Sequence, residues 1–126
     1  MENLCLQPTT STPLINLDSE HGILEISGES YPENSFEFYA PIKKWIREYL
    51  PVATARIHVN INLIYLNTSS TRCLIEILDD LDDAFKKGKD IQVTWFYDEE
   101  NDRAAETAEE FKEDITLPFL ITAVKS

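Results

Sequence analysis

The chain has 126 residues, of which 43% are apolar, so it is long enough for one domain with a single buried core. It has 11 basic and 23 acidic residues, and its formal net charge is −12. The segment from Glu76 to Asp114 holds 15 of the acidic and 5 of the basic residues, a net −10. Such a surface repels phosphate backbones and anionic lipids, which argues against nucleic acid and membranes as partners and leaves a cation or a basic protein surface.

The cysteines and the N-terminus indicate where the protein works. Cys5 and Cys73 form no C-x-x-C motif and have no histidine near them in sequence, which is typical of reduced thiols in a cytoplasmic protein. The N-terminus lacks the basic region and long apolar run of a signal peptide. No segment approaches the ~20 apolar residues of a membrane helix. We therefore expect one soluble, cytoplasmic domain spanning residues 1–126.

The first half of the chain predicts short strands followed by a helix. Apolar runs predict strands at Leu4–Leu6, Leu14–Leu17 and Ile23–Ser27, and the last two form a hairpin around a turn at His21-Gly22. A loop is expected from Gly28 to Asn34, and Ser35 is expected to cap the next helix. The core face of this helix is predicted from three- and four-residue spacing: Phe36, Tyr39, Ile42, Ile46, Tyr49 and Leu50. Pro41 marks either a kink or the first turn of this helix, and Pro51 ends it.

The second half alternates strands and helices. Strands are predicted at Arg56–Leu66, Ile91–Tyr97 and Phe119–Val124, and the first of them has the clearest alternation of apolar residues. Trp95 and Tyr97 should share one face of their strand and Phe96 the other, with core packing as their role. Helices are predicted before Gly88 and at Ala104–Phe111. The core face of the former is Leu74, Ile77, Leu78, Leu81 and Phe85.

This order of elements predicts an α/β fold. We expect a mixed β-sheet, with an N-terminal antiparallel hairpin followed by a βαβαβ unit of parallel strands, packed with about three helices. Loops that leave the C-terminal ends of parallel strands form the functional edge of such a sheet. The segment that follows Leu66 lies at that edge.

Four consecutive hydroxyl residues begin the helix there: Thr68, Ser69, Ser70 and Thr71. One of them suffices to cap a helix, which stabilises it by ~1 kcal/mol. The alternative is phosphorylation, because a helix start offers unpaired N–H groups and partial positive charge to a phosphate. The residue pattern leaves both interpretations open.

Catalysis and metal binding have weaker support. No G-x-S-x-G elbow or glycine-rich phosphate loop is present, and neither His21 nor His58 is placed as the base of a nucleophile. Asp79, Asp82 and Asp83 can share one helical face, which suits Mg²⁺ or Ca²⁺. However, the calcium-loop spacing and its glycine are missing. A solvated face turned away from the apolar stripe is the favoured interpretation, and no metal or other cofactor is assigned.

Three segments resemble the SiaC family of bacterial regulators. They are "GESYPENS" before the first long helix, "YLNTSS" after the central strand and "WFYDEENDRAAETAEEFKED" near the end. The similarity extends over the full length. It implies a fold like that of anti-sigma-factor antagonist (STAS) domains and a protein that is not an enzyme but is itself the substrate of a kinase.

The resemblance also implies a mechanism and its residues. A dedicated protein kinase phosphorylates a threonine that corresponds to Thr68, with Asn67, Ser69 and Ser70 as its neighbours, and a PP2C-type phosphatase removes the phosphate. The unmodified form binds and activates a diguanylate cyclase, which raises cyclic di-GMP and promotes biofilm formation. The family's SYPENS segment contributes a partner-binding edge, here Tyr31, Pro32, Glu33, Asn34 and Ser35.

Alternatives remain open. A relative could act as an anti-sigma-factor antagonist in a partner-switching pathway, or the acidic segment could belong to an undetected metal-binding protein or enzyme. The sequence does not decide the downstream effector or the oligomeric state. It also leaves open whether the acidic 76–114 segment binds a cation or a basic partner, and whether Ser69, Ser70 or Thr71 is modified as well.

Overall fold

A six-stranded mixed sheet forms the frame of the protein in the computed structural model, which describes residues 1–125. Each strand lies beside its neighbour in sequence: β1 (Leu4–Leu6), β2 (Leu14–Asp18), β3 (Ile23–Ser30), β4 (Ile57–Leu66), β5 (Ile91–Asp98) and β6 (Phe119–Val124). The pairs β1–β2 and β2–β3 are antiparallel, and β3 to β6 are parallel. The predicted fold class is confirmed.

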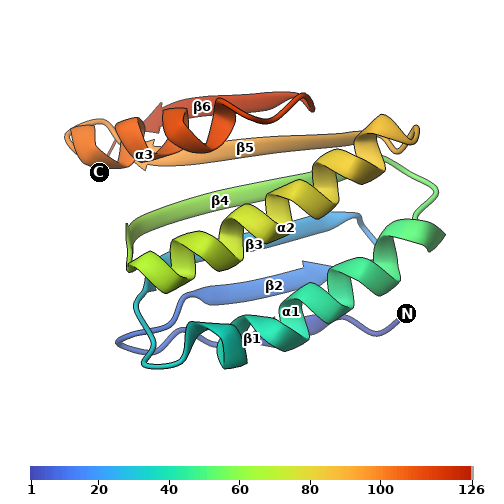
Figure 1. Cartoon of the computed structure of the whole chain (residues 1–126), viewed down its shortest axis with the longest axis horizontal. Helices are drawn as coiled ribbons and strands as arrows, with labels where there is room; N and C mark the ends of the chain where they lie inside the picture. Colours follow the sequence, from blue (N-terminus) through green and yellow to red (C-terminus); the bar gives the residue numbers. More distant parts are fainter. Residues whose placement is uncertain (126) are drawn as a thin grey trace.

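Three helices cover one face of this sheet, as Figure 1 shows. They are α1 (Ser35–Tyr49), α2 (Thr68–Lys86) and α3 (Asp102–Lys112), and a short 3-10 turn, η1 (Leu50–Val52), follows α1. Right-handed crossovers between consecutive parallel strands place every connecting helix on the same side. The result is a two-layer molecule, and none of its described helices is long and apolar enough to span a bilayer.

The core lies between the sheet and the helices. Along β4, the side chains of Ile57, Val59, Ile61 and Leu63 are buried, whereas those of His58 and Asn62 are exposed on the uncovered face. Each fully buried aliphatic side chain of this kind stabilises the fold by about 1.5–3 kcal/mol. On β5, Trp95 is fully buried and its ring stacks on Phe111 of α3, with 5.2 Å between ring centroids.

Two expected boundaries shift in the structure. β3 continues through Gly28, Glu29 and Ser30, where a loop was expected, because a register shift after Gly28 (φ 117°) lets the strand resume its pairing with β4. The N-cap of α1 is Asn34, whose side chain accepts a hydrogen bond from the Glu37 amide. The prediction that Ser35 caps this helix was therefore wrong by one residue.

Phe36 was also wrongly assigned to the core. The buried stripe of α1 starts at Ser35 and continues through Tyr39 and Ile42, and Phe36 lies about 100° around the helix from Ser35. Its side chain is 49% exposed. Pro41 lies inside α1 on an exposed position, so the helix begins before it.

Candidate functional site

Two helices begin side by side at one edge of the sheet. Ser30 at the end of β3 pairs with Leu66 at the end of β4, and both strands then lead into helices. The Asn67 amide donates a hydrogen bond to the Ser30 carbonyl oxygen at 3.0 Å, which fixes the start of α2 against β3. The positive ends of the α1 and α2 dipoles therefore meet at this edge (Figure 1).

A chain of buried hydroxyls joins these elements beneath the surface. Ser30 Oγ lies 2.7 Å from Tyr39 Oη and 2.8 Å from Ser70 Oγ. Ser70 Oγ in turn lies 3.0 Å from Ser35 Oγ. Burial is the main cause that raises the pKa of Tyr39 to about 12, although its hydrogen bond with Ser30 partly opposes this. The chain is therefore uncharged over the whole physiological pH range.

Asn67 organises the outer end of this chain as the N-cap of α2. Its Oδ1 accepts hydrogen bonds from the Ser70 amide at 2.9 Å and from Ser69 Oγ at 3.3 Å. Ser69 Oγ also donates to Ser35 Oγ at 2.7 Å, and Thr71 Oγ1 donates to the Asn67 carbonyl oxygen at 3.0 Å. The N-cap of α2 is thus Asn67, which lies outside the run of four hydroxyl residues.

Thr68 differs from the other three hydroxyl residues. Its side chain is exposed, and among the described residues its hydroxyl forms no hydrogen bond, whereas Ser69, Ser70 and Thr71 are all engaged. Ser70 is completely buried. As the first residue of α2, Thr68 stands where a helix favours an anion. Of the four hydroxyl residues, Thr68 is the one that is exposed and free of hydrogen bonds among the described residues.

One aromatic ring and one cation line a hollow beside Thr68. A shallow hollow of about 490 Å³ is lined by Phe36, Asn67, Thr68, Ser69 and Arg72. Arg72 lies one helical turn after Thr68, the spacing at which an anion and a cation attract each other along a helix. Sequence reasoning missed Arg72, although its i+4 spacing from Thr68 was readable, and it placed Phe36 in the core.

The Tyr31–Ser35 segment borders this surface but is only partly accessible. Tyr31, Glu33 and Asn34 are exposed, and the Tyr31 ring contacts that of Tyr65 edge to face, with centroids 5.9 Å apart. Pro32 and Ser35 are buried, and the Pro32 carbonyl oxygen accepts a hydrogen bond from Asn67 Nδ2 at 3.4 Å. We call the exposed surface of Tyr31, Phe36, Tyr65, Thr68 and Arg72 the switch patch.

The acidic run on α2 divides between surface and core. Asp79 and Asp83 are exposed, but Asp82 is buried, which contradicts its predicted place on a solvated face. Its Oδ1 accepts hydrogen bonds from the Leu117 amide at 2.9 Å and the Thr116 amide at 3.0 Å. Burial by itself would raise the pKa of Asp82, but these hydrogen bonds and one from Thr116 Oγ1 hold it below its usual value.

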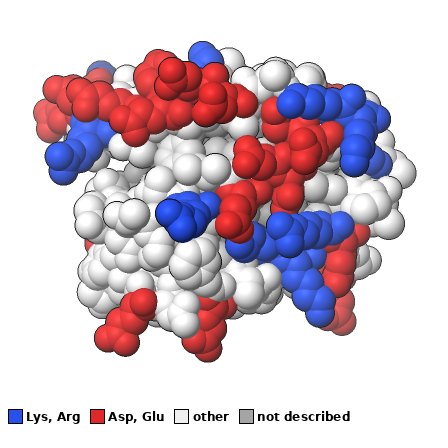
Figure 2. Space-filling view, in the orientation of Figure 1, with Lys and Arg blue, Asp and Glu red and all other residues white. Residues whose placement is uncertain are grey.

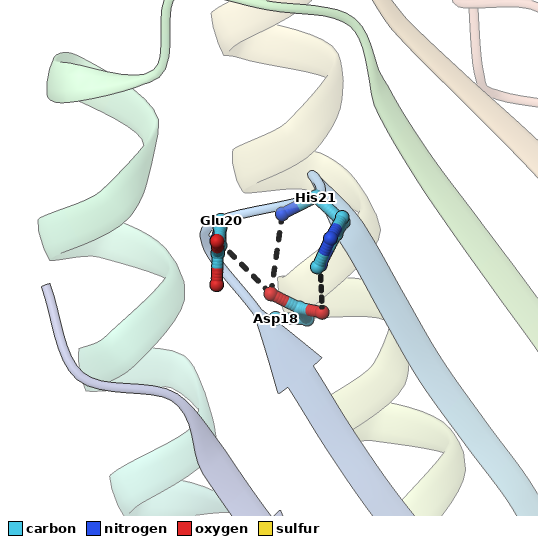
Figure 3. Close-up of side chains that lie close together, drawn as sticks. All are labelled: Asp18, Glu20 and His21. Carbon is cyan, nitrogen blue, oxygen red and sulfur yellow. Dashed lines mark hydrogen bonds and ion pairs between the residues drawn. The ribbon is translucent and has the colours of Figure 1, made fainter.

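Another polar cluster lies at the opposite edge of the sheet, in the turn between β2 and β3 (Figure 3). Asp18 Oδ2 lies 2.7 Å from His21 Nδ1, and Asp18 Oδ1 accepts from the Glu20 and His21 amides. The hydrogen bond with His21 lowers the pKa of Asp18, and the same contact raises that of His21. These bonds are what a tight hairpin turn requires, so the cluster has a structural explanation.

Comparison with known proteins identifies the family. The family model described as "SiaC family regulatory phosphoprotein" matches residues 6–124. The chain belongs to this family. The resemblance of its three sequence segments is thereby confirmed, and so is its role as a regulatory phosphoprotein of the SiaC type.

Relatives of this SiaC family protein come from Pseudomonas aeruginosa. An uncharacterized protein of strain UCBPP-PA14 is 41% identical over 123 residues, which cover 98% of each chain. Apo-SiaC has a TM-score of 0.93 at 40% identity, with 98% of this chain and 100% of that one covered. SiaC in complex with the diguanylate cyclase SiaD, of which it is the activator, has a TM-score of 0.93 at 40% identity, with 96% and 99% covered.

Proposed function

We propose that this protein is a phosphorylation-controlled activator of a diguanylate cyclase, with Thr68 as the phosphate acceptor. In this proposal a kinase modifies Thr68, a PP2C-type phosphatase reverses the modification, and the unmodified protein binds the cyclase through the switch patch. The protein itself catalyses no reaction. One observation carries the proposal. Of the four hydroxyl residues, Thr68 is the one that is exposed and forms no hydrogen bond with a described residue, and it is the first residue of a helix.

The solved complex of a relative supports the choice of a diguanylate cyclase as the effector. SiaC of P. aeruginosa activates the diguanylate cyclase SiaD, and the present chain shares its family and its fold. The switch patch also has the composition of a binding surface, because aromatic and arginine side chains are enriched at the energetic centres of protein interfaces. Tyr31, Phe36 and Tyr65 are 37%, 49% and 49% exposed.

The effect of phosphorylation follows from charge. A phosphate on Thr68 adds about two negative charges to the switch patch. Burying an uncompensated charge in an interface costs on the order of 3–5 kcal/mol. Arg72 and the amides of the first turn of α2 offset part of this cost. We therefore expect the affinity for the cyclase to fall roughly tenfold to a hundredfold, which corresponds to about 1.4–2.8 kcal/mol.

Calorimetry with the diguanylate cyclase of the same organism tests the proposal. Unmodified protein and Thr68→Ala should bind with equal affinity, phosphorylated protein weakly, and Thr68→Glu in between because it carries a single charge. Thr54→Glu adds the same charge at an exposed position before β4, at the opposite edge of the sheet, and should bind normally. Equal affinity of the phosphorylated and unmodified forms would end the proposal, and binding to an anti-sigma factor instead would assign the protein to the alternative pathway.

A further inference from the structure

The helical layer has a groove between α2 and α3. α1 packs closely on α2, whereas α3 rests on β4, β5 and β6 and scarcely touches α2. The groove between them has a volume of about 600 Å³. In Figure 2 an uncharged, hollowed surface lies between the acidic side chains over α3 and those over α2. The layer thus lacks an element at this place.

The floor of the groove is apolar and open to solvent. Ile64 and Tyr65 at the end of β4 are 61% and 49% exposed, and Ile75 of α2 is 45% exposed. Leu78 and Phe111 continue the floor between the two helices. A contiguous apolar surface with a polar rim is typical of a site where another protein binds.

The rim of the groove carries an excess of carboxylates. Asp79 of α2 faces Glu106 and Glu110 of α3 and Asp114 just beyond its C-terminal end, and Arg103 is the cation among the lining residues. Within the part of the chain that the structure describes, none of these four carboxylates has a cationic side chain within 4 Å. Burial, followed by the nearby carboxylates of Asp83, Asp80, Asp82 and Asp114, raises the pKa of Asp79. The rim therefore carries four carboxylates against one cation.

We propose that this groove is the docking site for an amphipathic helix of a partner protein, with an apolar stripe flanked on both sides by lysine or arginine. The stripe would cover Ile64, Tyr65 and Ile75, and the flanking cations would pair with the rims on α2 and α3. α3 has 11 residues and is therefore about 16 Å long, so three to four turns of the partner helix fill the groove.

The charges select this occupant over a second copy of the chain. Two copies would each carry a net charge of −12, and their mutual repulsion opposes association through an acidic rim. The proposal does not depend on phosphorylation of Thr68, because it rests on the groove's own shape, exposure and charge.

Three synthetic peptides of about 14 residues, stapled to hold the helix, provide the probes. One has a leucine stripe flanked by lysines, the second has glutamates in place of the lysines, and the third has the lysine composition in scrambled order. Each is titrated into isotope-labelled full-length protein and followed by amide NMR signals. We expect saturable shifts at Ile64, Ile75 and Glu106 with the first peptide alone.

Charge reversal gives a matched control on the same helix. Glu106→Lys combined with Glu110→Lys should weaken the lysine peptide by at least about tenfold and confer binding of the glutamate peptide. Glu109→Lys combined with Glu113→Lys makes the same change in net charge at exposed positions outside the groove, and should have an effect of less than about threefold. The proposal is overturned by equal effects of the two variants, by equal binding of the scrambled peptide, or by the absence of saturable groove shifts.

Discussion

Hydrogen bonding separates the four hydroxyl side chains that open α2. The buried hydroxyl of Ser70 forms hydrogen bonds with Ser30 and Ser35, and the hydroxyls of Ser69 and Thr71 also form hydrogen bonds within the protein. Phosphorylating any of these three residues would therefore break existing contacts. Thr68 has no such contact among the described residues. If the proposed phosphorylation takes place, the folded structure by itself favours Thr68 among the four adjacent hydroxyls.

Asn67 should be a stability residue and Thr68 should not. Asn67→Ala removes the acceptor of the Ser70 amide and of Ser69 Oγ, and losing an N-cap costs about 1–2 kcal/mol. Thr68→Ala should change the free energy of unfolding by less than about 0.5 kcal/mol, because the side chain is exposed and unbonded. Urea unfolding of both variants measures the difference. Equal losses would contradict the assigned cap.

Regular elements could be predicted from the sequence because their signals are local. The alternation in β4 and the apolar spacing in α2 each lie within one element, and both elements were found. Asp82 and Phe36 could not be placed in this way. The burial of Asp82 depends on the chain at Thr116, 34 residues later, and the exposure of Phe36 depends on where the buried stripe of α1 starts.

The candidate site was predicted only in part for the same reason. Thr68 and Asn67 follow the strongest strand directly, so their position at the sheet edge could be read from the sequence. The contacts of Ser35 with Ser69 and Ser70 join residues 34 and 35 positions apart. Such contacts are set by the packing of α1 against α2, which no local pattern encodes.

At the scale of elements, Asp82 ties α2 to the segment before β6. One carboxylate oxygen accepts three hydrogen bonds from Thr116 and Leu117, and Lys86 lies 3.4 Å from the other oxygen. Removing a buried acceptor leaves these donors unsatisfied, which costs about 1–3 kcal/mol. One side chain thus joins α2 to the segment that precedes the last strand.

Asp82→Asn keeps an acceptor oxygen but removes the negative charge and the ion pair with Lys86. Because hydrogen bonds to a charged acceptor contribute more than those to a neutral one, it should destabilise the protein by about 1–3 kcal/mol at neutral pH. Because the pKa of Asp82 is lowered in the folded protein, its contribution is fully present above the unfolded value near 3.8 and is lost as pH falls through the folded value. The two proteins should then converge in stability at low pH. Asp83→Asn, an exposed neighbour, is the control, and urea unfolding across acidic pH makes the comparison. An unchanged gap between Asp82→Asn and wild type at low pH would refute this account.

Over the whole chain, negative charge is concentrated in one segment. The segment from Asp98 to Asp114 contains nine acidic and two basic residues, a net −7 of the total −12. Its helix, α3, buries only Ala104, Ala108 and Phe111, whereas α2 buries seven residues. The carboxylates of Glu109, Glu110 and Glu113 also lie near the C-terminal end of α3, where the helix dipole disfavours anions.

This distribution predicts that salt stabilises α3 more than the rest of the fold. Each carboxylate near the C-terminal end of a helix costs about 0.3–1 kcal/mol at low ionic strength, and screening removes this cost. The Debye length falls from about 30 Å at about 0.01 M salt to about 10 Å at about 0.1 M. Raising sodium chloride from the lower to the higher of these concentrations should slow the hydrogen exchange of the α3 amides several-fold. The exchange of the α2 and β4 amides should change little. Glu109→Gln combined with Glu113→Gln should reduce the salt effect in α3 alone, and an equal response of α2 and α3 in the wild type would contradict the prediction.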